Sequence, residues 1–126
     1  MRMRTPLKSV RRLGSAREGS EHFWAQRVTA VANMILAIAF VALIASLAGA
    51  DHASVKAAVA NPLVSLVLLL FVVSGTYHMK LGMQVVIEDY ITGEGMKIIL
   101  LMLNMFFAIV IGLACILAIL KISFGT

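Results

Sequence analysis

The sequence predicts an all-α integral membrane protein with three transmembrane helices. Apolar residues make up 61% of the 126-residue chain and charged residues only 13%, with a mean hydropathy of +0.98. A soluble domain is about half apolar and about a quarter charged. The excess lies in three uncharged stretches of 23, 19 and 23 residues, which are Val28–Ala50, Asn61–Met79 and Ile98–Leu120. Because about 20 helical residues cross ~30 Å of hydrocarbon, each stretch is long enough, or nearly so, to span a bilayer.

These stretches lack the polar face that a water-soluble helix bundle needs. The whole chain, residues 1–126, is therefore expected to form a single membrane domain. We expect its spans at about residues 28–50, 61–87 and 98–120.

The segment before the first span is basic. Residues 1–20 contain Ser and Gly and show no periodicity, so we expect them to be flexible. Seven of the eleven basic residues precede the first span, namely Arg2, Arg4, Lys8, Arg11, Arg12, Arg17 and Arg27. Since Lys and Arg beside a span are retained in the cytoplasm, we expect a cytoplasmic N-terminus and, after three crossings, a periplasmic C-terminus. A nucleic-acid-binding tail is disfavoured because only membrane segments follow.

Small residues and turn signals mark the first span and its exit. Ala42, Ala45, Ser46 and Gly49 recur at helical spacing, and such a stripe lets helix backbones approach closely in lipid. Residues 51–60 are expected to form a short external loop. Asn61 and Pro62 then begin the second helix, with proline in the tolerated first turn.

The third span lies between Lys97 and Lys121. It carries a small-residue stripe of its own, formed by Ala108, Gly112 and Cys115. Because Cys115 is the single cysteine, the chain has no disulfide framework, and we expect Cys115 to serve in packing.

The second helix carries polar residues where its apolar stretch ends. Polar groups at this depth are costly and by default indicate function. His78 is the 17th residue counted from Pro62, roughly 25 Å along the helix. Small residues three or four positions away lie on its face and leave flat space that a porphyrin would fit, namely Ser74, Gly75 and Gly82. A neutral imidazole can bind iron, but it can equally form a hydrogen bond to a neighbouring helix, and both interpretations stay open.

Two further polar residues follow on the same helix. Asp89 is eleven positions after His78, about three turns, so it lies on the same face and roughly 16 Å nearer the cytoplasm. Tyr90 is its neighbour around the helix.

The spacing His-x3-Gly-x-Gln-x4-Asp-Tyr, formed by His78, Gly82, Gln84, Asp89 and Tyr90, resembles the signature of a known family. That family is the small hydrophobic membrane anchor of succinate dehydrogenase, in its α-proteobacterial and mitochondrial form. The segment 26–30, which reads Gln-Arg-Val-Thr-Ala, also resembles the family's entry into its first span.

The resemblance implies roles for four residues. It implies that His78 is an axial ligand to the iron of a haem b shared with a companion cytochrome b subunit. It implies that Tyr90 donates a hydrogen bond to ubiquinone with Asp89 beside it, and that Arg27 lies near the haem propionates. Members often have a basic residue or histidine soon after the Asp-Tyr pair, whereas Ile91 follows here, so a phosphate or headgroup contact is not expected at this point.

The resemblance also implies a function and partners. The chain would anchor the flavoprotein and iron–sulfur subunits of succinate dehydrogenase at the bacterial inner membrane, pack with the cytochrome b subunit in a helix bundle, and help bind ubiquinone. It would be a non-flavin subunit, since it has neither a cysteine set for a cluster nor a Gly-rich nucleotide loop. The alternatives are a non-redox three-helix assembly or accessory protein and the anchor of a fumarate reductase. No nucleic acid is expected among the partners; membrane lipid is.

Overall fold

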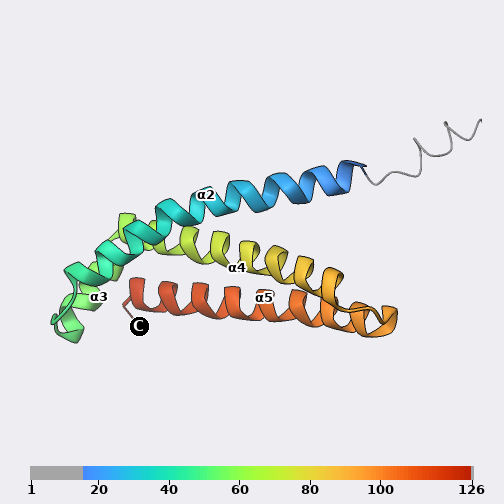
Figure 1. The fold of residues 1–126 in the computed structure, drawn as a ribbon. Coiled ribbons are helices and arrows are strands. Elements are labelled where there is room, and N and C mark those ends of the chain that lie inside the picture. Colours follow the sequence, from blue (N-terminus) through green and yellow to red (C-terminus); the bar gives the residue numbers. More distant parts are fainter. Residues whose placement is uncertain (1–15, 126) are drawn as a thin grey trace, which may run out of the picture.

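The computed structural model describes residues 16–125, and four α-helices account for nearly all of them (Figure 1). The helices are α2 (Ala16–Ser46), α3 (His52–Ala60), α4 (Pro62–Tyr90) and α5 (Glu94–Ser123). Three segments are long and apolar enough to cross a membrane, with mean hydropathies of 2.5, 1.8 and 2.7: Gly19–Ser46, Pro62–Tyr90 and Glu94–Ser123. The prediction of three spans is therefore confirmed.

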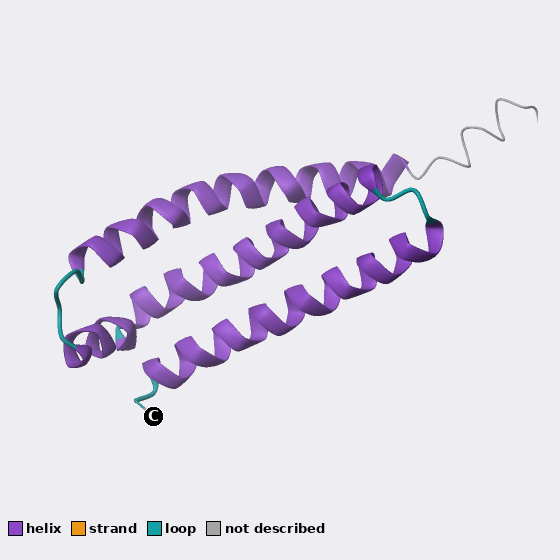
Figure 2. Ribbon diagram, turned by 60° about the horizontal axis from the view of Figure 1, so that its bottom comes forward, coloured by secondary structure: helices purple, strands orange, loops and turns teal. Residues whose placement is uncertain are grey.

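Helix α4 lies between the other two long helices. It packs against both α2 and α5, whereas α2 and α5 do not contact each other. The start of α2 and the α4–α5 connection lie at one end of the molecule, and α3 and the end of α5 lie at the other (Figures 1 and 2). The start of α2 and the C-terminal end of α5 are consequently on opposite sides, as three crossings require.

The prediction for the chain before α2 stays a prediction, and the one for the chain after α2 is wrong. Flexibility is expected for residues 1–20; α2 begins at Ala16, and residues 1–15 lie outside the described residues. A loop is expected for residues 51–60, but His52–Ala60 is a helix. Asp51 caps it, because one carboxylate oxygen accepts the Ser54 N–H at 3.0 Å.

The start of α4 is as predicted. Asn61 is its N-cap and accepts the Leu63 N–H at 2.9 Å through its side-chain oxygen, and Pro62 occupies the first turn. The same residue ends α3, so a single residue separates the two helices.

Very little of the described chain is buried. The most buried apolar side chain is that of Leu81, 3% exposed, and no large side chain is completely buried. Large apolar side chains remain exposed along all three spans. Such a surface fits lipid and the helices of a partner subunit, because it needs no water-facing polar groups.

The small-residue stripes differ in what they contact. Ala108 and Gly112 are buried against α4, and a Cβ atom at Gly112 would lie 3.4 Å from Thr76 Oγ1. This stripe therefore sets the close approach of α4 and α5, except that Cys115 is exposed and takes no part in it. On the first span, Ala42 and Ser46 are exposed and line a groove between α2 and α4.

Candidate functional site

A histidine–threonine pair joins α4 to α2. The His78 Nδ1 atom lies 2.9 Å from the Thr29 hydroxyl oxygen, and both residues are half-buried. Thr29 stands in the first half of α2 and His78 beyond the middle of α4, 49 positions apart in sequence. The imidazole is thus held between two spans by a hydrogen bond through one of its two nitrogens.

The direction of this hydrogen bond follows from counting hydrogens. A threonine hydroxyl has one hydrogen to donate and two lone pairs. That hydrogen is directed to the Ala25 carbonyl at 2.7 Å, with a longer contact of 3.1 Å to the Gln26 carbonyl. With that hydrogen on the Ala25 carbonyl, Thr29 accepts at His78, the proton of a neutral imidazole is on Nδ1, and Nε2 keeps its lone pair. The opposite direction, in which Thr29 donates to an unprotonated Nδ1, has the same atom positions.

The Nε2 atom of His78 is available from outside the chain. It makes no hydrogen bond within residues 16–125, and it is not among the buried side-chain nitrogens and oxygens that lack a partner. A neutral imidazole nitrogen with an open lone pair is the form that binds iron.

Further polar contacts between α2 and α4 lie one helical turn away from the histidine–threonine pair, and together with it they form a polar seam. The Asn33 amide donates to the Ser74 carbonyl, and the Ser74 hydroxyl donates to the Thr29 carbonyl, both at 3.5 Å. Asn33 Oδ1 is buried and without a partner in the described part of the chain, 4.0 Å from the position of a Cβ at Gly75. Thr29 and Asn33 are four residues apart, as are Ser74 and His78, so matching faces of the two helices meet.

The predicted flat space beside His78 is only partly present. Ser74 and Gly75 contact α2 and do not open a space beside the imidazole. Gly82 has nothing within 4 Å of where a Cβ would be, so the chain leaves this side of α4 open. An oriented imidazole with an open nitrogen, one turn from an open glycine, fits a haem.

Asp89 and Tyr90 end α4. Tyr90 is 79% exposed, Asp89 is also exposed, and neither side chain has a hydrogen-bond partner within residues 16–125. The helix stops here, with Ile91 as its C-cap, at the end of the molecule where α2 begins (Figure 1). The phenol and the carboxylate are thus free to contact a molecule outside the chain.

Arg27 is not brought together with His78. It is two residues before Thr29, roughly 200° around α2, and therefore faces away from the pair. Its guanidinium carbon lies 3.4 Å from the centre of the Phe23 ring, a cation–π contact. The guanidinium forms no ion pair among the described residues, so its charge is available to an external carboxylate.

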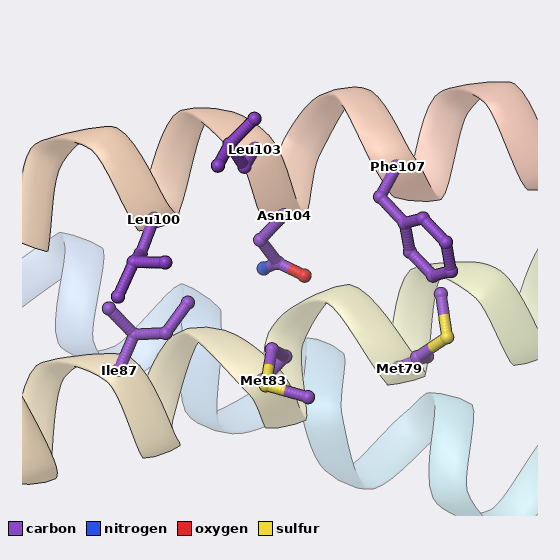
Figure 3. A pocket seen from close by; sticks show the side chains of 7 residues that line it. All are labelled: Met79, Met83, Ile87, Leu100, Leu103, Asn104 and Phe107. Carbon is purple, nitrogen blue, oxygen red and sulfur yellow. The ribbon is translucent and has the colours of Figure 1, made fainter.

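A groove of about 520 Å³ lies between α4 and α5 (Figure 3). Its lining is apolar except for one amide, and it consists of Met79, Met83, Ile87, Leu100, Leu103, Asn104 and Phe107. Asn104 points from α5 toward α4 and donates to the Lys80 carbonyl at 2.9 Å. This bond ties the two helices together, as an amide does in lipid, and the groove has no part in the histidine–threonine pair.

Thr29 and Asn33 received no role from the sequence. The available signal was that two polar residues interrupt an apolar span at four-residue spacing, which places them on one face. Which helix that face meets is decided by tertiary packing.

The chain is similar to membrane subunits of succinate dehydrogenase and fumarate reductase. Residues 1–120 match the family described as succinate dehydrogenase/fumarate reductase transmembrane subunit. The succinate dehydrogenase hydrophobic membrane anchor subunit of Paracoccus denitrificans is 37% identical over 97 residues, covering 77% of this chain and 75% of the relative. The protein of the same name from Rickettsia bellii is 30% identical over 116 residues, covering 92% and 93%. No solved structure gives a significant match.

Proposed function

The chain belongs to the family of succinate dehydrogenase/fumarate reductase transmembrane subunits, and from that premise we propose that it is a hydrophobic anchor of succinate dehydrogenase that binds haem b and ubiquinone. In this role it tethers the flavoprotein and iron–sulfur subunits and packs beside the cytochrome b subunit. The observation that carries the cofactor part is the free Nε2 of His78, oriented by Thr29 inside a membrane span.

Haem b would be held by His78 through Nε2 and shared with the cytochrome b subunit. The haem supplies one-electron transfer when bound. The guanidinium of Arg27 is exposed and forms no ion pair within residues 16–125, so it would suit a propionate carboxylate. Support for this assignment is chemical, since a guanidinium pairs with a carboxylate in two parallel hydrogen bonds.

Ubiquinone would be bound at the end of α4. The Tyr90 phenol is exposed and has no partner within residues 16–125, so it can donate to a quinone carbonyl that gains negative charge as electrons arrive. Asp89 can orient polar groups beside it. Succinate itself is oxidised on the flavoprotein subunit and not on this chain.

The orientation in the bacterial inner membrane follows from charge. At the end where α2 begins lie Arg27 and Lys97, and six further basic residues precede Arg27 in the sequence. The α3 end carries Lys56 and the terminal Lys121. Lys and Arg beside spans stay in the cytoplasm, so the Tyr90 end faces the cytoplasm and the C-terminus the periplasm.

An absorption spectrum of the membrane-extracted complex, reduced minus oxidised, tests the haem assignment. His78→Ala removes the iron ligand that this chain would supply, so we expect haem bands that are lost or clearly shifted. His52→Ala is the matched control, because His52 is exposed on α3 at the far end of the molecule. A His78→Ala complex that assembles with the wild-type spectrum would exclude His78 as the ligand.

A further inference from the structure

We propose that Thr29 is a positioning residue for the haem: its hydroxyl accepts the His78 Nδ1–H and thereby fixes the tautomer and the ligand strength of the imidazole. The inference rests on the proposed haem ligation by His78. It deepens that function by giving a role to a residue of the first span that would not itself contact the iron.

In the proposed arrangement Thr29 acts as the hydrogen-bond acceptor of His78. Its single hydrogen is engaged by the Ala25 carbonyl at 2.7 Å, and the remaining lone pair faces Nδ1 at 2.9 Å. A bond from a helical hydroxyl to the carbonyl four residues earlier is a common local contact that needs no other helix. The hydroxyl is therefore a preset acceptor before His78 packs against it.

Losing this acceptor would have two consequences. First, the Nδ1–H would sit half-buried without a partner, and the neutral ring could move its proton to Nε2, which blocks the nitrogen needed by iron. Second, a histidine ligand that donates its other N–H to an acceptor is more basic. A more basic ligand stabilises ferric over ferrous iron, so removing the acceptor should raise the midpoint potential of the haem.

The seam around the pair gives the hydroxyl no substitute. Of the neighbouring polar groups, the Ser74 hydroxyl donates to the Thr29 carbonyl, and the Asn33 amide donates to the Ser74 carbonyl. Asn33 Oδ1 is the unpartnered acceptor, but it lies beside Gly75, three residues before His78. Only Thr29 contacts Nδ1 within residues 16–125.

The test compares four substitutions in the assembled complex. Thr29→Val keeps the branched shape and removes the hydroxyl, Thr29→Ala removes it with a smaller side chain, and Thr29→Ser retains it. The matched control is Thr76→Val, because the Thr76 hydroxyl makes the same four-residue bond, to the Val72 carbonyl at 2.7 Å, but faces Gly112 on α5. The readouts are haem content per complex and the midpoint potential from a redox titration in membranes.

We expect Thr29→Val and Thr29→Ala to retain haem roughly ten- to hundredfold more weakly, as outer-shell substitutions typically do. The haem that stays should titrate at a higher potential; a tenfold loss of preference for ferric iron is about 59 mV for one electron. Thr29→Ser and Thr76→Val should match the wild type. If Thr29→Val fails to assemble, Thr29→Ala is read in the same way.

The outcomes separate this inference from the function on which it rests. Wild-type haem content and potential in Thr29→Val, together with lost or shifted bands in His78→Ala, would overturn the positioning role alone. Failure of Thr29→Ser to restore the potential would also overturn it, because shape and not the hydroxyl would then matter. An unchanged spectrum in His78→Ala would overturn haem ligation itself.

Discussion

The residues proposed to bind external groups differ in how far the chain itself fixes them. His78 is held by a hydrogen bond to another helix, and its Nε2 atom has no hydrogen-bond partner within residues 16–125. Tyr90 is held only by the backbone at the end of α4 and is 79% exposed. A haem ligand needs a fixed direction, whereas a quinone donor at a subunit boundary is expected to gain its remaining contacts from the partners.

Tyr90→Phe tests the quinone site, because it keeps the ring and removes only the hydroxyl. We expect assembly and dye-coupled succinate oxidation to be largely intact while succinate–ubiquinone reductase activity falls about tenfold or more. The reason is that a hydrogen bond to a charged group is typically worth about 1.5–3 kcal/mol. Tyr77→Phe is the control, since it alters the other tyrosine of the chain, which lies next to His78 within the span. If the Tyr90→Phe variant reduced quinone at the wild-type rate, Tyr90 would serve only as an interfacial anchor.

The individual candidate residues could be predicted from the sequence only in part. The depth of His78 in its helix follows from counting residues after Pro62, since helical rise is constant. Its partner Thr29 does not follow, because the pairing depends on where two helices cross and no local pattern encodes that. The expected grouping of Ser74 and Gly75 with Gly82 failed for the same reason: α2 covers the first two.

The helices themselves were predictable where length and apolarity agree. The three spans satisfy both, so their existence is fixed by the cost of exposing them to water. Helix α3 was missed although four of its nine residues are alanine, the best helix former, and Asp51 and Asn61 flank it as caps. The segment is too short to span a membrane, and it connects two spans, which favoured the interpretation as a loop.

The cap of α3 has a predictable pH dependence. Hydrogen bonds from the Ser54 side chain and backbone to the Asp51 carboxylate lower the pKa of Asp51 below its ordinary value. A lowered folded-state pKa means that the cap stabilises α3 above the unfolded pKa, about 3.9, and loses this effect as the pH falls through the folded pKa. We therefore expect amide hydrogen exchange at Ser54 and Val55 to quicken in acid, once the loss of base catalysis is corrected for.

Two substitutions separate the charge from the cap. Asp51→Asn retains a capping oxygen that does not titrate, so exchange in α3 should lose this acid dependence. Asp51→Ala should speed exchange at all pH values. The natural control is the start of α4, where Asn61 caps without a charge and the Leu63 N–H should show no such transition. Equal acid sensitivity at both helix starts would contradict the assignment to Asp51.

At the scale of the whole molecule, the three spans form an open helix bundle. Helices α2 and α5 pack on α4 but not on each other, and the spans keep most of their apolar side chains exposed. Among residues 16–125, the Nε2 atom of His78 has no hydrogen-bond partner, a Cβ at Gly82 would have no neighbour within 4 Å, and Arg27 forms no ion pair. A second subunit that covers these features would complete both the bundle and the cofactor site.

The arrangement of the two ends gives the last prediction, which concerns topology. Three crossings place the start of α2 and the end of α5 on opposite sides, and the basic residues before Val28 favour the cytoplasm for the first. Reporter fusions at residue 20 and residue 126 should therefore report the cytoplasm and the periplasm. Fusions at Thr92, between α4 and α5, and at Ala50, before α3, are internal controls that should report the cytoplasm and the periplasm respectively. If both ends were on the same side of the membrane, the three-span fold would be contradicted. If the ends were on opposite sides but with the N-terminal end in the periplasm, only the charge argument would be contradicted, and the proposed quinone site at Tyr90 would lie at the periplasmic face.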